Sequence, residues 1–336
     1  MKDDKTINFG LIGPGKVADQ RLAPALGGSQ QARLWSVLGR NGDHTSAFAR
    51  KHDAKAAQPA FIDLKQFLAD PDLDAVLIAT PDHLHAEFAI AALESGHAAF
   101  IEKPITSNVA EAWPLVDAAV LTGLPAGVCY HLRFHEGLRQ MVSMVHDGAV
   151  GTPLHMRVRW SYRSPDGTSH WRAKTSGGLW SLAAFGTHAL DLIRWTLVPM
   201  CGEVVLVRGL VSGGVWGTGK DETAIGLLQF ASGATAELIS SVLFESEPLA
   251  EVVGDRGTAV ARHAFDPHGT GFIQVCGRPV EFPVVDPYKA EVDDLAFCVR
   301  ERRTPAVNCI EALRNLQILT EIVSSGQGSV ISKKAS

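Results

Sequence analysis

Several features that define other classes of protein are scarce in this sequence of 336 residues. Its five cysteines include no C-x-x-C pair, so neither a zinc site nor a dithiol redox motif is indicated. No apolar run approaches the roughly 18 residues that span a bilayer, and the start of the chain lacks a signal-peptide pattern. The 31 Lys and Arg residues form no dense basic block, which argues against a nucleic-acid partner. These absences predict a cytoplasmic protein with reduced thiols, no membrane contact and a small-molecule partner.

Apolar residues make up 46% of the chain and charged residues 20%, as is ordinary for a globular protein. The length exceeds that of one compact domain and predicts two. We expect a doubly wound parallel sheet of the Rossmann type in residues 1–125. An α+β domain with a large, mostly antiparallel open sheet is expected in residues 126–336, and its C-terminal helices could pack back on the first domain.

Short β-type apolar runs alternate with helical stretches in the first third of the chain, which is the signature of βαβ units. The expected strands are Ile7–Ile12, Leu34–Leu38, Ala75–Ala79, Ala98–Ile101 and Ala126–Tyr130. The expected helices are Ala47–His52, Leu64–Leu68, Ala86–Ser95 and Ala110–Leu121. Together they predict a nucleotide-binding domain.

After residue 130 the pattern becomes strand-rich, and helical periodicity returns near the end. The expected strands are Leu154–Tyr162, Glu203–Val211, Ala224–Phe230, Ala234–Leu243 and Ala250–Val253. Ser232-Gly233 separates two of them as a hairpin turn would. Helices are expected at Lys289–Glu301 and Glu311–Ser324.

A glycine-rich turn follows the first expected strand. Gly13 permits a tight turn, Gly15 lets the backbone approach a pyrophosphate, and Ala18 allows close packing of helix on strand. The helix N-terminus would then face the negative charge. We predict a nicotinamide dinucleotide site at Gly13, Pro14, Gly15, Lys16, Val17 and Ala18.

The end of the second expected strand bears on the choice between NAD and NADP. An NAD-binding domain usually presents Asp or Glu here to the ribose 2′-hydroxyl, but the residues are Gly39-Arg40-Asn41. Gly39 leaves room and Arg40 offers a cation, which suits a 2′-phosphate. We therefore predict a preference for NADP over NAD. The alternative is that Arg40 lies along the adenine face with either cofactor.

Two polar motifs follow later strands, at the carboxyl ends where such sheets bind ligands. They are Thr80-Pro81-Asp82-His83-Leu84-His85 and Glu102-Lys103-Pro104. Together with His131-Leu132-Arg133-Phe134, Trp171-Arg172 and Gly186-Thr187-His188-Ala189-Leu190-Asp191, they resemble the motifs of the glucose-fructose oxidoreductase and inositol dehydrogenase family (Gfo/Idh/MocA). The resemblance runs over most of the chain.

This resemblance implies reversible hydride transfer between a nicotinamide and a hydroxyl-bearing carbon of a sugar, sugar derivative or cyclitol. It also implies a homodimer or homotetramer formed through the sheet of the second domain. Two alternatives remain open. One is a keto-sugar or other carbonyl reductase that uses the same residues, and the other is a non-catalytic protein that senses dinucleotide and sugar.

The resemblance assigns the proton chemistry to Lys103 and His188. An ammonium group at Lys103 can hydrogen-bond the reacting oxygen and relay a proton, with Glu102 orienting it. An imidazole at His188 is suited to taking the proton from a carbinol. Many family members carry Asp four residues before this histidine, where the present sequence has Ala184. A proton relay could then pass through His188 alone, through water, or through Asp191 or Tyr162.

The same resemblance suggests further contacts. Cofactor contacts are expected from Thr80, Pro81, His85, Glu102, Lys103 and Arg172, and substrate contacts from His131, Tyr162, Trp171 and Asp191. His131 and His135 are four residues apart, but without a third ligand nearby we expect no metal. The tryptophans at 113, 160, 195 and 216 fall in amphipathic patterns that are typical of core or interface positions.

Overall fold

A computed structural model describes residues 6–175 and 177–326 and divides the chain into two compact units. Unit 1 comprises the chain up to Gln140 together with Ala264–Phe272 and Glu281–Leu316. Unit 2 comprises Met141–His263, Ile273–Val280 and the chain from Gln317 onward. No helix in the described part of the chain is long and apolar enough to cross a membrane.

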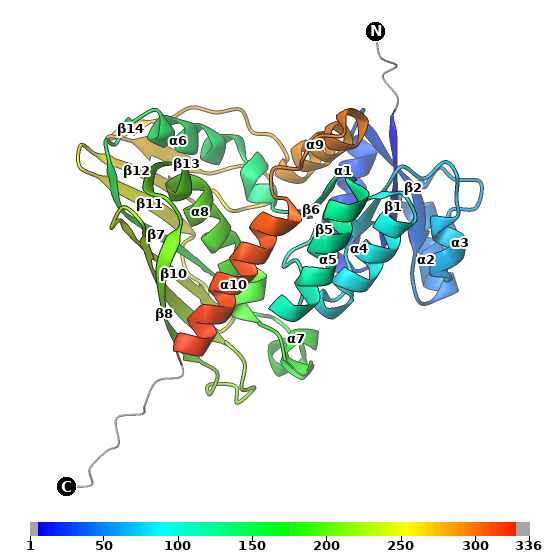
Figure 1. The fold of residues 1–336 in the computed structure, drawn as a ribbon, viewed down its shortest axis with the longest axis horizontal. Helices are drawn as coiled ribbons and strands as arrows, with labels where there is room; N and C mark the ends of the chain where they lie inside the picture. Colours follow the sequence, from blue (N-terminus) through cyan, green and yellow to red (C-terminus); the bar gives the residue numbers. More distant parts are fainter. Residues whose placement is uncertain (1–5, 176, 327–336) are drawn as a thin grey trace, which may run out of the picture. The chain divides into compact units, whose positions relative to one another are not determined.

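Unit 1 is built on a six-stranded parallel sheet (Figure 1). Its strands are β1 (Ile7–Ile12), β2 (Ala32–Leu38), β3 (Ala60–Phe61), β4 (Ala75–Ile78), β5 (Ala98–Glu102) and β6 (Ala126–Cys129). Their order, β3-β2-β1-β4-β5-β6, is that of a doubly wound nucleotide-binding fold. Every residue of β1 is buried, as expected for a parallel strand covered on both faces.

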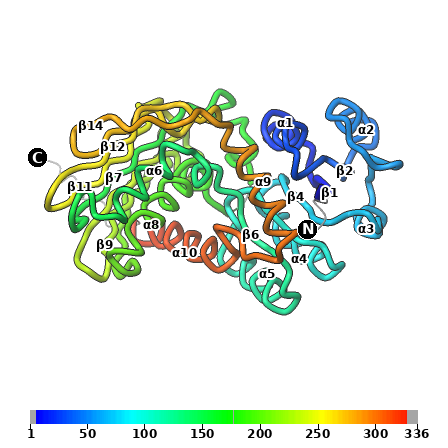
Figure 2. Tube along the Cα trace, turned by 90° about the horizontal axis from the view of Figure 1, so that it is seen from above, coloured from blue at the N-terminus to red at the C-terminus, as the bar shows by residue number. Residues whose placement is uncertain are grey.

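Helices cover both faces of this sheet. Those of unit 1 are η1 (Ala18–Leu22), α1 (Ala23–Gly28), α2 (Gly42–Lys51), α3 (Leu64–Leu68), η2 (Asp82–Leu84), α4 (His85–Glu94), α5 (Val109–Thr122), η3 (His131–Phe134) and α9 (Pro287–Glu301). Figure 2 shows α1 and α2 on one side of the strands and α4 and α5 on the other. The apolar side of α9 returns to this core, where Val292, Leu295 and Ala296 pack against the cluster that surrounds Phe9.

Unit 2 is built on an eight-stranded sheet of order β14-β13-β12-β11-β7-β10-β9-β8. Its strands are β7 (Pro153–Ser161), β8 (Val204–Ser212), β9 (Thr223–Phe230), β10 (Thr235–Ser241), β11 (Leu249–Gly254), β12 (Thr258–Arg262), β13 (Phe272–Val275) and β14 (Arg278–Pro279). β7 and β10 run parallel, whereas β9 pairs antiparallel with both β8 and β10. The sheet is therefore mostly antiparallel, as the sequence predicted.

One face of this sheet is covered by helices (Figure 1). The remaining helices are η4 (Gly167–Ser169), α7 (Trp171–Lys174), η5 (Leu182–Gly186), α8 (Thr187–Cys201), α6 (Glu136–His146) and α10 (Cys309–Ser325), of which α6 and α10 begin in unit 1 and end in unit 2. α8 packs on β7 and β10. Gly209 and Gly226 lie against Ile322 of α10, and a side chain at either position would collide with it. These two glycines allow the close approach of helix and sheet.

The structure differs from the expected elements in two respects. Ala126–Gln140 belongs to unit 1, because β6 extends the parallel sheet beside β5, whereas the sequence placed the division after residue 125. In addition, the expected elements did not include β3, β12, β13, β14, α6, α7 or α8. The short β strands have little periodicity of their own, and they are defined by pairing with distant neighbours.

Candidate active site

The glycine-rich turn leaves β1 with a backbone that only glycine adopts readily. Gly13 has a φ of +90°, and its N–H donates to the Leu38 carbonyl oxygen at 3.0 Å. A Cβ at Gly13 would lie 2.9 Å from the Ala79 carbonyl oxygen. A Cβ at Gly15 would instead meet nothing closer than 4.0 Å. The space above Gly15 is therefore open to a ligand, while the space at Gly13 is filled by the protein.

A helical segment begins directly after this turn and runs through η1 into α1. Lys16 and Val17 are exposed in its first turn, and Ala18 is fully buried against the sheet. Beside Gly13, the buried Thr80 hydroxyl has no hydrogen-bond partner among the described residues. An open glycine, a helix N-terminus and an unpartnered hydroxyl fit the phosphates of a dinucleotide.

His85 joins the two loops that follow β4 and β5. The imidazole is fully buried, with Nδ1 2.8 Å from the Pro104 carbonyl oxygen and Nε2 3.0 Å from that of Thr80. The peptide bond between Lys103 and Pro104 is cis. His85 thus fixes the positions of Thr80 and of the loop that carries Lys103, while Pro81 is exposed beside it.

Lys103 stands at the end of β5, next to a buried aromatic pair. Glu102 pairs in register with Cys129 of β6, so Lys103 lies near the start of η3. There the rings of His131 and Tyr288 stack with centroids 4.5 Å apart and an angle of 10° between their planes. His131 is only 6% exposed. The contact with Tyr288 of α9 is one that the sequence pattern did not predict.

Burial, followed by the positive charge of Lys103, lowers the pKa of His131 to about 3. The imidazole is therefore neutral near pH 7. Burial also raises the pKa of the Tyr288 phenol well above its usual value, as do the charges of Glu102 and Glu291. The aromatic pair near Lys103 thus comprises an uncharged histidine and an un-ionised tyrosine.

The end of β2 contains the residues predicted to select the cofactor. A Cβ at Gly39 would collide with Thr45 and with Pro14 of the glycine-rich turn. Arg40 is exposed, and Asn41 caps α2 by accepting a hydrogen bond from the His44 N–H at 2.9 Å. Nε2 of His44 lies 2.9 Å from the Pro14 carbonyl oxygen. Gly39 is thus required for packing, and the Arg40 side chain is left available at this corner.

In unit 2, His188 lies in the first turn of α8 and is buried. Its ring centroid is 5.2 Å from that of Trp160 on β7. Asp191, also buried, lies one helical turn further on. Ala184 lies in η5, a π-helical turn that leads into α8. The helix therefore carries the histidine and a nearby carboxylate, with alanine at the position four residues before His188.

Asp221 organises the start of this helix and was not singled out from the sequence. Its buried carboxylate accepts hydrogen bonds from the N–H groups of Trp180 at 2.6 Å and Leu182 at 2.7 Å, and from the Ser181 hydroxyl at 3.1 Å. Burial raises the pKa of Asp221, and these hydrogen bonds oppose the rise. No local pattern in the sequence marks this role, because donor and acceptor are about 40 residues apart.

The other predicted residues of unit 2 lie at its surface. Tyr162 is 48% exposed and Trp171 is 36% exposed. The guanidinium of the half-buried Arg172 lies over the Trp171 ring, 4.3 Å from its centroid. These residues belong to the segment between β7 and η5.

Within residues 6–175 and 177–326, no three His, Cys, Asp or Glu side chains are grouped so that they could hold a metal ion. The ring of His135 is engaged elsewhere. Its Nε2 lies 2.9 Å from the Thr270 carbonyl oxygen, and its Nδ1 accepts a hydrogen bond from Leu138 at 3.3 Å.

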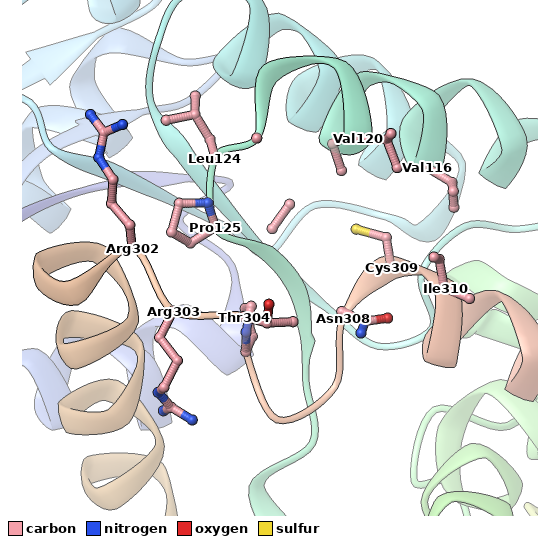
Figure 3. Close-up of a pocket in the computed structure, with 14 residues that line it drawn as sticks. Val116, Val120, Leu124, Pro125, Arg302, Arg303, Thr304, Asn308, Cys309 and Ile310 are labelled. Carbon is pink, nitrogen blue, oxygen red and sulfur yellow. The ribbon is translucent and has the colours of Figure 1, made fainter.

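A cavity of about 320 Å³ in unit 1 lies away from these groups, between α5 and residues 302–310. It adjoins the amino end of β6, whereas the glycine-rich turn and Lys103 follow carboxyl ends of strands. Figure 3 shows Arg302 and Arg303 pointing away from Cys309. Burial raises the pKa of the Cys309 thiol to about 12. The cavity therefore has no part in the chemistry at Lys103.

Comparison with known proteins decides the family. Residues 7–130 match the profile described as "Oxidoreductase family, NAD-binding Rossmann fold", and residues 138–260 match the GFO/IDH/MocA C-terminal domain. The chain belongs to the Gfo/Idh/MocA family. The resemblance inferred from the sequence motifs is thereby confirmed, and so is the fold class.

Relatives of this Gfo/Idh/MocA protein include named enzymes. The 1,5-anhydro-D-fructose reductase of Ensifer adhaerens is 25% identical over 79% of this chain and 78% of its own. D-xylose 1-dehydrogenase (NADP(+)) 2 of Haloferax volcanii is 26% identical over 95% of this chain and 97% of its own. Other relatives are scyllo-inositol 2-dehydrogenases that use NAD(+) or NADP(+). The protein is an NAD(P)-dependent oxidoreductase.

A solved structure shows the same fold along nearly the whole chain. Aldose-aldose oxidoreductase from Caulobacter crescentus superimposes with a TM-score of 0.88 and 21% sequence identity, covering 96% of this chain and 98% of that one. This Gfo/Idh/MocA protein thus has the family's dinucleotide-binding unit and its large open sheet.

The depressed pKa of His131 makes stability depend on pH. Between the unfolded value near 6.5 and the folded value of about 3, the unfolded chain binds a proton that the folded chain does not. The contribution of His131 to stability is therefore complete above pH 6.5 and is lost as the pH falls toward 3. The variant His131→Phe keeps an aromatic ring against Tyr288 but cannot titrate. We expect urea unfolding between pH 7 and pH 5 to show a smaller loss of stability in this variant than in the wild type.

The exposed His83 provides the matched control, because His83→Phe removes a histidine without touching the stack. An unchanged pH dependence in His131→Phe would show that the folded and unfolded proteins protonate this imidazole alike, which would contradict the depressed pKa.

Proposed function

We propose that the enzyme transfers hydride between the nicotinamide C4 and a hydroxyl-bearing carbon of a sugar, sugar derivative or cyclitol. The observation that carries the proposal is the position of Lys103. It follows β5 at the same sheet edge where the turn at Gly13 follows β1 and Thr80 follows β4. An ammonium group at this edge serves a reaction in which negative charge develops on oxygen. The bound dinucleotide supplies the acceptor or donor of hydride.

The site residues take distinct parts in this proposal. Gly13, Pro14, Gly15, Lys16, Val17 and Ala18, with Gly39 and Thr80, hold the dinucleotide. His85 fixes the loops on which Thr80 and Lys103 stand. The Lys103 ammonium donates a hydrogen bond to the reacting oxygen and releases or accepts its proton. His131 beside Lys103 is uncharged, so it adds no second positive charge near the proton that Lys103 releases or accepts.

His188 acts as the base that takes the proton of the carbinol in oxidation and returns it in reduction. Four residues before His188, where the family resemblance implies an Asp, this chain has Ala184. The orientation of His188 therefore depends on other contacts. We propose Asp191 for this part, since it is buried one turn away on the same helix. The exposed Tyr162 and Trp171 and the half-buried Arg172 are proposed as substrate or cofactor contacts in unit 2.

The same residues serve carbonyl reduction and alcohol oxidation, because a proton carrier works in both directions. Ala184 favours the alternative of a sensor that binds sugar without turnover. Lys103 and the buried His188 favour catalysis, and the named relatives are enzymes that act in one direction or the other.

Replacing Lys103 tests the proposed chemistry. Lys103→Met retains the length of the stem but removes the ammonium, and loss of such a group typically lowers turnover about 100-fold or more. We expect NAD(P)H formation on a panel of aldoses, polyols and inositols to fall by that factor while cofactor binding, followed by fluorescence titration, is retained. Lys65→Met, at an exposed position on α3, is the control. Equal turnover in Lys103→Met and the wild type would remove Lys103 from the mechanism. If the wild type formed no NAD(P)H with any sugar of the panel, the sensor would be favoured.

We further propose that the enzyme prefers NADP, because Arg40 is exposed at the end of β2 where NAD-binding domains usually have an acid. A guanidinium bonded to a 2′-phosphate contributes roughly 1.5–3 kcal/mol.

Arg40→Ala should accordingly lower kcat/KM for NADP by about 10- to 100-fold and leave the value for NAD nearly unchanged. Steady-state kinetics with both cofactors measures this. Arg50→Ala, at an exposed position of α2, is the matched control. A wild type that works better with NAD would contradict the proposal.

We also propose a homodimer or homotetramer formed through the uncovered face of the eight-stranded sheet. Leu206 and Leu210 on β8 and Leu227 on β9 share that face and are 42%, 64% and 52% exposed. An apolar patch of this kind is typical of an interface between subunits.

Leu210→Asp places a charge on this face opposite Ile225, its partner in register on β9. We expect light scattering to show a smaller species than the wild type, since an unpaired buried charge opposes association. Leu121→Glu, on the surface of α5, is the control. A monomeric wild type would refute the proposal.

A further inference from the structure

Unit 2 contains a hollow of about 470 Å³ at the turn that follows β7. Arg163, Ser164, Asp166 and Thr168 line it, together with the indole of Trp216. Small-molecule sites occupy roughly 300–1,000 Å³, so the hollow is large enough for a ligand. Its lining combines a cation, a carboxylate, two hydroxyls and one aromatic ring.

This combination matches the chemistry of a neutral sugar ring. The C–H groups of a pyranose pack on an aromatic face, while its hydroxyls bond to hydroxyl, carboxylate and guanidinium groups. The opposite charges of Arg163 and Asp166 cancel, so the lining does not favour a phosphate or a carboxylate ligand.

Trp216 is presented to the hollow by a loop that a single carboxylate holds in place. Residues 213–219 include four glycines, which would leave such a loop conformationally free. The Glu222 carboxylate accepts hydrogen bonds from the N–H groups of Val215 at 3.0 Å, Trp216 at 2.9 Å and Thr218 at 3.1 Å, and from the Thr218 hydroxyl at 2.7 Å.

Burial alone would raise the pKa of Glu222, but these hydrogen bonds hold it below its usual value. The loop is therefore ordered before any ligand arrives, and an aromatic group fixed in advance binds with a smaller loss of entropy. The Trp216 ring also packs on Trp180 with centroids 5.5 Å apart.

A series of ring contacts within unit 2 runs from His188 to Tyr162, the residue directly before the hollow. The Trp160 ring lies 5.2 Å from His188 and 5.4 Å from Phe185. Phe185 lies 6.4 Å from the exposed ring of Tyr162, and the hollow begins at the next residue, Arg163. His188 is not among the residues that line the hollow, so a single sugar ring bound at His188 would leave the hollow unfilled.

We propose that this hollow is a second sugar subsite, and that the substrate is a disaccharide or glycoside whose outer, non-reacting ring stacks on Trp216. The inference rests on the proposed function for the position of the reacting ring. Contacts to the outer ring then contribute binding energy at a distance from the reacting carbon.

Matched pairs of sugars test the subsite. Glucose is compared with maltose and cellobiose, galactose with lactose, and xylose with xylobiose, by kcat/KM for NAD(P)H formation. We expect one disaccharide to exceed its monosaccharide, and Trp216→Ala to lower the value for that disaccharide about tenfold without changing the value for the monosaccharide. Trp216→Phe should restore most of the difference. Trp113→Ala, which removes a half-exposed tryptophan from α5 in unit 1, should leave both values unchanged.

Equal losses on both sugars in Trp216→Ala, or a monosaccharide preferred throughout the panel, would overturn the proposal. Asp166→Asn and Thr168→Val repeat the test on the exposed turn if Trp216→Ala does not fold, and an unchanged disaccharide preference in both would also overturn the proposal.

If the wild type turns over no sugar, the proposed function fails, and a binding measurement then tests the subsite separately. Saturation-transfer NMR with maltose and cellobiose should show contact in the wild type that Trp216→Ala loses, whereas no transfer in the wild type would refute the subsite.

Discussion

Parallel pairing of β1 with β4 and of β4 with β5 is the constraint on which the chemistry of unit 1 depends. In a parallel sheet, the carboxyl ends of neighbouring strands meet at one edge. The glycine-rich turn and Lys103 directly follow such ends and Thr80 is the second residue after β4, so residues about 90 positions apart share one edge. The fully buried His85 then ties two of these loops together through their carbonyl oxygens.

In unit 2, the carboxylates of Asp221 and Glu222 hold the functional segments in place, as the parallel sheet does in unit 1. Asp221 bonds the N–H groups that open η5, and through them it sets the start of the helix carrying His188. Glu222 bonds the N–H groups of the loop that carries Trp216. Each carboxylate is buried and satisfied by several donors, which is what makes burial of a charged group tolerable. The helix that carries His188 and the loop that carries Trp216 are therefore fixed by carboxylates at adjacent positions on the chain.

Ala184 stands where the motif of the family resemblance implies a carboxylate. The buried Asp191 offers a carboxylate from within α8 itself, one turn after His188 instead of one turn before it. Near Lys103, the stacked rings of His131 and Tyr288 add no charge to the site. Both rings are held in their uncharged forms, so the lysine is the positive group nearest to the reacting oxygen in the proposed mechanism.

Local patterns in the sequence determined the parallel sheet, the glycine-rich turn and the position of the motif lysine, because each depends on residues that are close along the chain. β1 begins and ends where its apolar run does, and the hairpin turn at Ser232-Gly233 joins β9 to β10. Only the tertiary structure decided which distant groups meet. The stack of Tyr288 on His131 and the capping by Asp221 join residues that are tens to more than a hundred positions apart. Trp216 was expected at a core or interface position, but it lies in a glycine-rich loop beside Arg163 and Asp166. The hydrogen bonds to Glu222 that hold this loop have no signature in the sequence.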